Sequence, residues 1–125
     1  MTPHDAVLAF LSAINQRDAD RLAERLTEDH EFIDSLGNQV RGREKMRAGW
    51  RGYYSLCPDY WVAHEHILAE GNVVAVFGTA GGTIAGQSWR TPAAWLATVE
   101  DGLVSQWRVY ADNKPVYDIL AQTAK

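Results

Sequence analysis

Cysteine, long apolar runs and an excess of basic charge are all scarce in this 125-residue sequence. The single cysteine, Cys57, excludes an internal disulfide and a thiolate metal cluster, and its position before Pro58 without a cationic neighbour predicts a small buried side chain. No apolar stretch is long enough to span a bilayer, and no basic-then-apolar signal pattern opens the sequence. We therefore expect a cytoplasmic protein without a membrane partner.

The charge balance argues against a nucleic-acid partner. The net charge is −4, whereas phosphate binding requires a concentrated basic surface. Five basic residues nevertheless cluster within eleven positions: Arg41, Arg43, Lys45, Arg47 and Arg51. We interpret them as a solvated helix face in preference to an anion site.

Sequence signatures of common cofactor sites are also missing. There is no P-loop, dinucleotide fingerprint, nucleophile elbow or zinc-protease helix. We therefore expect neither a nucleotide cofactor nor a covalent nucleophile, and we assign no cofactor.

Helical signals dominate the first half of the sequence. Thr2 and Pro3 are typical of a helix start, and apolar residues from Val7 to Ile14 recur at helical spacing. Asp18 is predicted to cap a second short helix that ends near Thr27, and residues 30–34 are read as a first strand. A third helix is expected from Arg43 to just before Pro58.

From residue 60 onward the apolar period changes to two. Four strands are expected at residues 60–69, 73–83, 88–100 and 103–111, joined by short glycine-bearing turns as in an antiparallel meander. Gly78, Gly81 and Gly82 lie within one of these strands and favour a sharp bend, so the sheet is expected to curl. Residues 115–122 are read as a closing helix or a docked tail.

Several short motifs add to this order of elements. They are NQRDAD at residues 15–20, TEDHEFID at 27–34, GRE at 42–44, PDY at 58–60, AEGN at 69–72, EDGLV at 100–104 and WRVYAD at 107–112. In this order they resemble the nuclear-transport-factor-two-like superfamily, specifically its SnoaL-like and ketosteroid-isomerase-like members.

The resemblance covers nearly the whole chain and implies one SnoaL-like domain over residues 1–125. It implies an α+β fold, a cystatin-like roll in which a cone-like curved antiparallel β-sheet wraps around N-terminal helices and encloses a pocket. It also implies homodimers formed through the outer face of the sheet. The superfamily includes isomerases, polyketide cyclases, epoxide hydrolases, dehydratases and non-catalytic members, so the fold alone does not define a reaction.

Asp34 is the strongest catalytic candidate. Alternation along the first strand places Phe32 and Asp34 on one face, and Phe32 is expected to face the interior. A carboxylate in an apolar pocket would have its pKa raised by desolvation, which suits proton abstraction near neutral pH. The position resembles the general-base aspartate of ketosteroid-isomerase-like proteins. Asp34 could equally cap the turn at residues 35–38.

The remaining apparatus of two related enzyme classes is missing. In ketosteroid isomerase, which is a standard example of tuned acidity, a tyrosine and a protonated aspartate stabilise the oxyanion. Phe10 and Trp95 stand at or beside those positions, so steroid isomerisation by that arrangement is not expected. The Asp-Arg-Asp set of epoxide hydrolases would require charged residues at the positions of Val76, Gly78 and Val109. These three positions are uncharged, and we therefore reject that reaction.

His64, Asp112 or a tyrosine could act as the proton partner of Asp34. His64 and His66 are expected on one face of a strand, where they could bind a metal, but two ligands are too few and we assign no metal site. Ordinary hydrogen bonding of the pair is the favoured interpretation. Asp112 follows the last strand and could instead cap the closing segment.

The abundant aromatic residues suggest a pocket wall as well as a core. Small residues at Gly78, Ala80, Ala93 and Ala97 are expected to leave space for a flat hydrophobic ligand. The candidate substrate-binding residues are Phe10, Phe32, Trp50, Tyr53, Tyr60, Trp95 and Val109.

Two functions remain open on this evidence. The first is a cofactor-independent acid/base enzyme of the isomerase, polyketide cyclase or dehydratase type, acting on a small hydrophobic carbonyl compound. The second is a non-catalytic small-molecule-binding or dimeric assembly domain that uses the same pocket.

Overall fold

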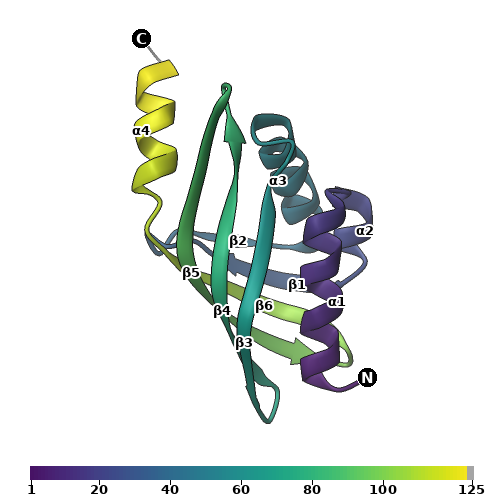
Figure 1. The fold of residues 1–125 in the computed structure, drawn as a ribbon. Helices are drawn as coiled ribbons and strands as arrows, with labels where there is room; N and C mark the ends of the chain where they lie inside the picture. Colours follow the sequence, from purple (N-terminus) through teal and green to yellow (C-terminus); the bar gives the residue numbers. More distant parts are fainter. Residues whose placement is uncertain (124–125) are drawn as a thin grey trace.

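The computed structural model describes residues 1–123 as an α+β fold built on one six-stranded sheet, shown in Figure 1. The sheet order is β2-β1-β6-β5-β4-β3. The helices are α1 (Pro3–Gln16), α2 (Ala19–Ala23), α3 (Arg43–Leu56) and α4 (Lys114–Thr123). The strands are β1 (Leu26–Ile33), β2 (Gln39–Arg41), β3 (Trp61–Glu70), β4 (Val73–Ile84), β5 (Gln87–Glu100) and β6 (Leu103–Ala111).

The N-terminal helices begin where their capping residues predict. The Thr2 side chain accepts a hydrogen bond from the Asp5 amide, and the Asp18 side chain accepts hydrogen bonds from the amides of Asp20 and Arg21. The second helix, however, ends at Ala23, and the segment around Thr27 lies in β1 instead of a helix. Pairing with β6 explains this difference, because hydrogen bonds to a distant strand override the local preference.

The sheet combines the predicted meander with one parallel pair. Strands β3 to β6 pair antiparallel in sequence order, as expected. Strand β1 pairs parallel with β6, and the short strand β2, which the sequence did not predict, pairs antiparallel with β1. Figure 1 shows the sheet curling, so that β1 and β2 run in a different direction from the long strands β3 to β5.

The glycines of β4 mark close approaches that accompany this curl. A side chain at Gly78 would collide with the backbone carbonyl of Ala63, next to a register shift in β3 between His64 and His66. A side chain at Gly82 would collide with Cys57 Sγ. Cys57 is fully buried there, and its burial raises the pKa of the thiol, which agrees with the predicted role as a packing residue.

An aromatic core joins α1 to the sheet. Phe10 is fully buried and contacts Trp107 edge to face, with 4.7 Å between ring centroids. Trp107 in turn stacks on Trp95 at 6.0 Å. These contacts anchor the first helix on the inner face of β5 and β6.

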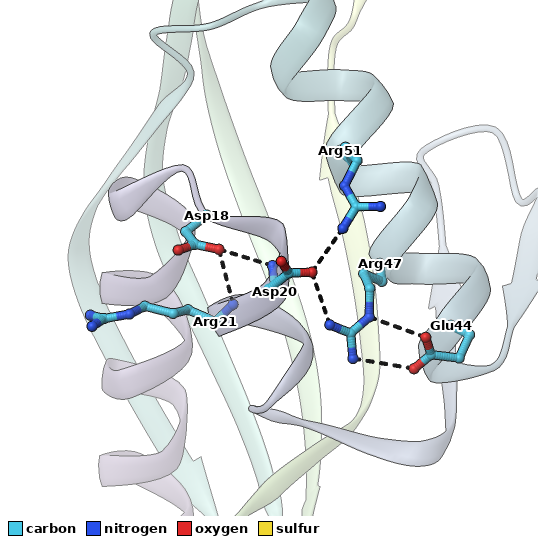
Figure 2. A network of polar contacts seen from close by, with 6 residues as sticks. All are labelled: Asp18, Asp20, Arg21, Glu44, Arg47 and Arg51. Atoms are coloured by element: carbon cyan, nitrogen blue, oxygen red, sulfur yellow. Dashed lines mark hydrogen bonds and ion pairs between the residues drawn. The ribbon is translucent and has the colours of Figure 1, made fainter.

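Two arginines of the basic cluster, Arg47 and Arg51, are matched by nearby carboxylates (Figure 2). Asp20 on α2 accepts hydrogen bonds from Arg47 at 2.9 Å and from Arg51 at 2.8 Å, and Arg47 also binds Glu44. The hydrogen bond from Arg47 lowers the pKa of Asp20. Because these charges neutralise one another on the surface of α2 and α3, Arg47 and Arg51 agree with the expected solvated helix face.

Candidate functional site

An apolar cavity of about 310 Å³ lies between α3 and strands β1, β5 and β6. This volume is within the usual range for small-molecule sites. Aromatic side chains form most of its wall, and a few polar groups stand among them. The lining residues are Phe32, Asp34, Ser35, Val40, Lys45, Met46, Gly49, Trp50, Tyr53, Tyr60, Trp95, Trp107, Val109 and Asn113.

Two other hollows in the described part of the chain are larger but less suited to a hydrophobic ligand. One, of about 530 Å³, borders the ion pair between Asp20 and Arg51, and its lining is mainly polar. The other, of about 380 Å³, lies beside Asp59 and Arg90. Both hollows are more open to solvent than the apolar cavity, which is therefore the candidate site.

The cavity contains most of the side chains that the sequence proposed as substrate contacts. Phe32, Trp50, Tyr53, Tyr60, Trp95 and Val109 all line it. Phe10 does not, because its ring is packed against Trp107 in the core.

The space itself has a different origin from the one predicted. Gly78, Ala80, Ala93 and Ala97 were expected to leave room, yet none of them lines the cavity. Ala80 and Ala97 are buried in the core, and the backbone of β3 covers Gly78. The cavity instead lies between α3 and the strands, where large aromatic side chains such as Trp50, Tyr53 and Trp95 form its wall.

Asp34 lies at the cavity as predicted, but its carboxylate also organises a turn. The chain leaves β1 at Ile33, and Asp34 Oδ1 accepts hydrogen bonds from the amides of Leu36 and Asn38, both at 2.9 Å. Its Oδ2 accepts a third from Asn38 Nδ2 at 3.1 Å. The proposed cavity position and the alternative turn-capping role therefore coexist in this residue.

The predicted rise in the pKa of Asp34 is wrong. Burial raises this pKa, but the hydrogen bonds that Asn38 and Leu36 donate to the carboxylate, with a smaller contribution from the nearby Gly37 amide, outweigh it, and the net shift is downward. Asp34 is therefore ionised at neutral pH. Since a carboxylate oxygen accepts about two hydrogen bonds, Oδ2 keeps one acceptor position free of the turn.

His64 and Asp34 are not brought together. His64 is exposed on the edge strand β3 and does not line the cavity. The predicted shared face of His64 and His66 is also wrong, because the register shift places His64 opposite Gly78 and His66 opposite Phe77. Gly78 and Phe77 are adjacent in β4 and therefore face opposite sides of the sheet. Their partners His64 and His66 face opposite sides as well.

Asp112 likewise stands outside the cavity. It is exposed, and its Oδ1 accepts a hydrogen bond from the Lys114 amide at 3.0 Å, which caps α4 as the alternative interpretation expected. The following residue, Asn113, lines the cavity and donates a hydrogen bond to Ser35 Oγ at 2.6 Å. Neither Ser35 nor Asn113 was predictable as a cavity residue, because the composition of a turn does not reveal which of its polar side chains points inward.

Two tyrosines bring free hydroxyl groups to the cavity. Within residues 1–123, the hydroxyls of Tyr53 and Tyr60 have no protein hydrogen-bond partner, whereas Tyr54 donates to the Ile14 carbonyl at 2.9 Å. Burial raises the pKa of both cavity tyrosines well above the ordinary value, so both are neutral phenols. Trp50 adds a buried indole N–H that lacks a partner among the described residues.

In the described part of the chain, no group of three His, Cys, Asp or Glu side chains is arranged to hold a metal ion. No helix there is long and apolar enough to cross a membrane.

Comparison with known proteins identifies one family model, described as a SnoaL-like domain, that matches residues 7–107. No curated protein matches the chain.

Solved structures with the same fold come from several bacteria. A nuclear-transport-factor-two-like protein of unknown function from Cytophaga hutchinsonii is 22% identical, with 94% of this chain and 96% of that chain covered and a TM-score of 0.75. A Jannaschia protein described as a SnoaL-like polyketide cyclase is 23% identical, with 92% and 88% covered and a TM-score of 0.81. At these identities the likeness shows the fold alone.

An epoxide hydrolase of the LEH-like type from M. tuberculosis is 26% identical, with 94% of this chain and 85% of that chain covered and a TM-score of 0.79. This chain has Val76, Gly78 and Val109 at the positions where that reaction is expected to require charged residues.

Proposed function

This chain belongs to the SnoaL-like domain family, and from that premise we propose that it binds a small hydrophobic carbonyl compound and transfers a proton through Asp34. The observation that carries the proposal is the ionised Asp34 carboxylate at the rim of an aromatic cavity of about 310 Å³. The cavity supplies apolar area for a ring-sized ligand, and the carboxylate supplies a base that needs no cofactor.

In the proposed step, the free acceptor position of Asp34 Oδ2 takes a proton from the carbon next to the ligand carbonyl. The C–H bond breaks, its electron pair moves into the enolate, and an O–H bond forms on the carboxyl group. Return of the proton to another carbon completes an isomerisation. Attack of the enolate on a second carbonyl, with the proton on Asp34 passing to the new alkoxide, would give a cyclisation. Expulsion of a β-hydroxyl by the enolate, with the same proton passing to the departing oxygen, would release water and give a dehydration.

The lowered pKa of Asp34 limits the substrates that this base can serve. A weak base removes a proton efficiently only from a carbon acid that is itself comparatively acidic. The proposal therefore favours ketones whose reacting carbon also adjoins an aromatic ring or a second carbonyl, where the developing charge is delocalised. Such compounds are flat and hydrophobic, as the cavity wall requires.

Deuterium uptake by 2-tetralone tests this function. The purified protein in D₂O is expected to accelerate exchange at the carbon between the ring and the carbonyl, followed by NMR. Asp34→Asn should abolish the acceleration while keeping an acceptor oxygen for the amides of Leu36 and Asn38. Asp112→Asn is the matched control, because Asp112 lies outside the cavity. Equal acceleration by Asp34→Asn would refute the assignment.

A second function is ligand binding without catalysis, and the role of Asp34 in capping the turn after β1 favours it. Three hydrogen bonds hold the Asp34 carboxylate and lower its pKa, as is typical of a structural carboxylate. If this function is correct, a hydrophobic compound that co-purifies with the protein stays chemically unchanged during long incubation. Native mass spectrometry before and after incubation distinguishes the two functions.

We also propose that a second copy of the chain is a partner, bound through the outer face of the sheet. Phe77 on β4 is 43% exposed and Tyr110 on β6 is 49% exposed, and both are in register with Ala94 on β5. Leu68 on β3, 65% exposed, extends this patch beside Ala75. An apolar strip across four strands is the kind of surface that a homodimer covers.

A further inference from the structure

We propose that the hydroxyl groups of Tyr53 and Tyr60 form a donor pair that binds the acceptor oxygen of the cavity ligand. The inference rests on the proposed function for its ligand, and it adds the part of the site that recognises the carbonyl group. The sequence alone does not distinguish Tyr53 and Tyr60 from the other aromatic residues of the cavity wall, because it does not show which hydroxyl groups lack a partner.

The first observation is the contrast between three tyrosines that lie close together. Tyr54 is buried, and its hydroxyl donates to the Ile14 carbonyl, so its polar atom serves the packing of α1 against α3. Tyr53 and Tyr60 line the cavity and have no hydrogen-bond partner in the described part of the chain. A ligand that fills the apolar cavity would cut both hydroxyls off from solvent, so it must offer them an acceptor if these polar groups are not to be left unpaired.

The second observation is that the two rings are held in place. Tyr53 meets Tyr60 edge to face, with 4.9 Å between ring centroids. Tyr60 also stacks on Trp89 at 6.1 Å and lies against Trp50 at 6.2 Å. A donor on a fixed ring binds an acceptor without reorganisation, which is the arrangement that stabilises developing negative charge.

The third observation concerns the charge state of the pair. Burial raises the pKa of both phenols, so at neutral pH each carries its proton and can donate it. The ionised Asp34 is an acceptor at the same cavity. Donors and acceptor together fit a ligand that has both a carbonyl oxygen and an acidic C–H, which narrows the ligand class to enolisable aryl or conjugated ketones.

A matched ligand pair tests the donor role. 2-Tetralone and tetralin have the same carbon skeleton, but only the ketone has an acceptor oxygen. Isothermal titration should show that the wild-type protein binds 2-tetralone more tightly than tetralin by about 3- to 10-fold for each hydroxyl that donates, the range of a neutral hydrogen bond. The preference should shrink in Tyr53→Phe and Tyr60→Phe and vanish in the double variant. Tyr54→Phe, which removes a structural hydroxyl, should keep it.

An infrared measurement adds a direct reading of the contact. The carbonyl stretch of bound 2-tetralone should lie at lower frequency in the wild-type protein and in Tyr54→Phe than in the double variant. An unchanged preference and an unchanged frequency in the double variant would overturn the donor pair while leaving the proposed function intact. Failure of the wild-type protein to bind either compound would instead overturn the proposed ligand class, and the donor pair with it. Loss of deuterium exchange in Asp34→Asn alone bears only on the proposed function.

Discussion

Asp34 and Asn38 are joined by three hydrogen bonds across the turn between β1 and β2. The Asp34 amide donates to the Asn38 carbonyl at 2.9 Å. The Asn38 amide and side chain donate to the two oxygens of the Asp34 carboxylate, at 2.9 Å and 3.1 Å. Asn38 therefore fixes the direction of the proposed base and also sets its basicity.

Replacing Asn38 by alanine should raise the pKa of Asp34. The substitution removes the side-chain donor to Oδ2 and keeps the backbone donor to Oδ1, so the ionised form loses part of its stabilisation. A titration of the Asp34 carboxyl by ¹³C NMR measures the shift. Asn72→Ala, in the exposed turn between β3 and β4, is the matched control and should leave this pKa unchanged. No change in Asn38→Ala would mean that the side-chain hydrogen bond contributes nothing.

The same titration has a consequence for stability. The folded-state pKa of Asp34 lies below its ordinary value. The ionised carboxylate therefore stabilises the fold at every pH above that ordinary pKa. This contribution is lost as the pH falls through the folded-state pKa. Asn38→Ala should therefore show a smaller loss of stability on acidification than the wild-type protein.

Local signals explain why most of the fold was predictable from the sequence. The caps at Thr2 and Asp18, the glycine turns and the change of apolar period are all encoded within a few residues of one another. Strand β2 and the early start of β1 were missed because both depend on pairing with strands distant in the sequence. Propensity and periodicity carry no information about such pairing.

The candidate site was predictable in its walls but not in its chemistry. Alternation placed Asp34 at the cavity, yet the direction of its pKa shift depends on donors from a turn whose conformation the sequence did not specify. The bulge between His64 and His66 arises where β3 pairs with Gly78 of β4. A pattern of side chains that alternates strictly between the two faces of a strand cannot predict such a bulge. Tyr53 and Tyr54 are neighbours in sequence, and only the fold distinguishes the free hydroxyl from the bonded one.

His30 should make the protein less stable in mild acid. It is 1% exposed, and its Nδ1 hydrogen bonds to the Val104 carbonyl at 2.7 Å. Its Nε2 has no partner in residues 1–123, and desolvation lowers its pKa below the ordinary value of 6.5. The unfolded chain then binds more protons than the folded one as the pH falls below about 6.5, so stability is lost in that range.

Denaturant unfolding across this pH range tests His30. His30→Gln cannot titrate and can still donate to the Val104 carbonyl, so it should lose part of the acid sensitivity of the wild-type protein. His66→Gln changes an exposed histidine of β3 and serves as the control. An identical pH dependence in wild-type protein and His30→Gln would show that His30 does not govern it.

Phe77→Lys should convert the proposed dimer to a monomer. The substitution places a charge at the centre of the apolar strip, where desolvation on association would be costly. Light scattering coupled to size-exclusion chromatography measures the mass. Leu36→Lys introduces the same charge at a side chain that is 69% exposed outside the strip, and it should remain dimeric. A wild-type monomer, or a Phe77→Lys dimer, would contradict the assigned interface.

Gly82→Ala should destabilise the fold by about 1–3 kcal/mol, the usual cost of overpacking. The added methyl group would collide with Cys57 Sγ and lie 3.3 Å from Tyr60 Cα, so the start of β3 must shift. Gly52→Ala on α3 is the control, because its methyl group meets no atom within 4 Å and should stabilise the helix by about 0.5–1 kcal/mol. Thermal or denaturant unfolding measures both changes.

A double-mutant cycle identifies the cause of the destabilisation. If the thiol is the obstacle, Gly82→Ala combined with Cys57→Ala costs less than the sum of the single substitutions. Strict additivity would show that the cost comes from the other tight contacts, at 3.3 Å from Asp59 Oδ1 and Tyr60 Cα, and not from the thiol.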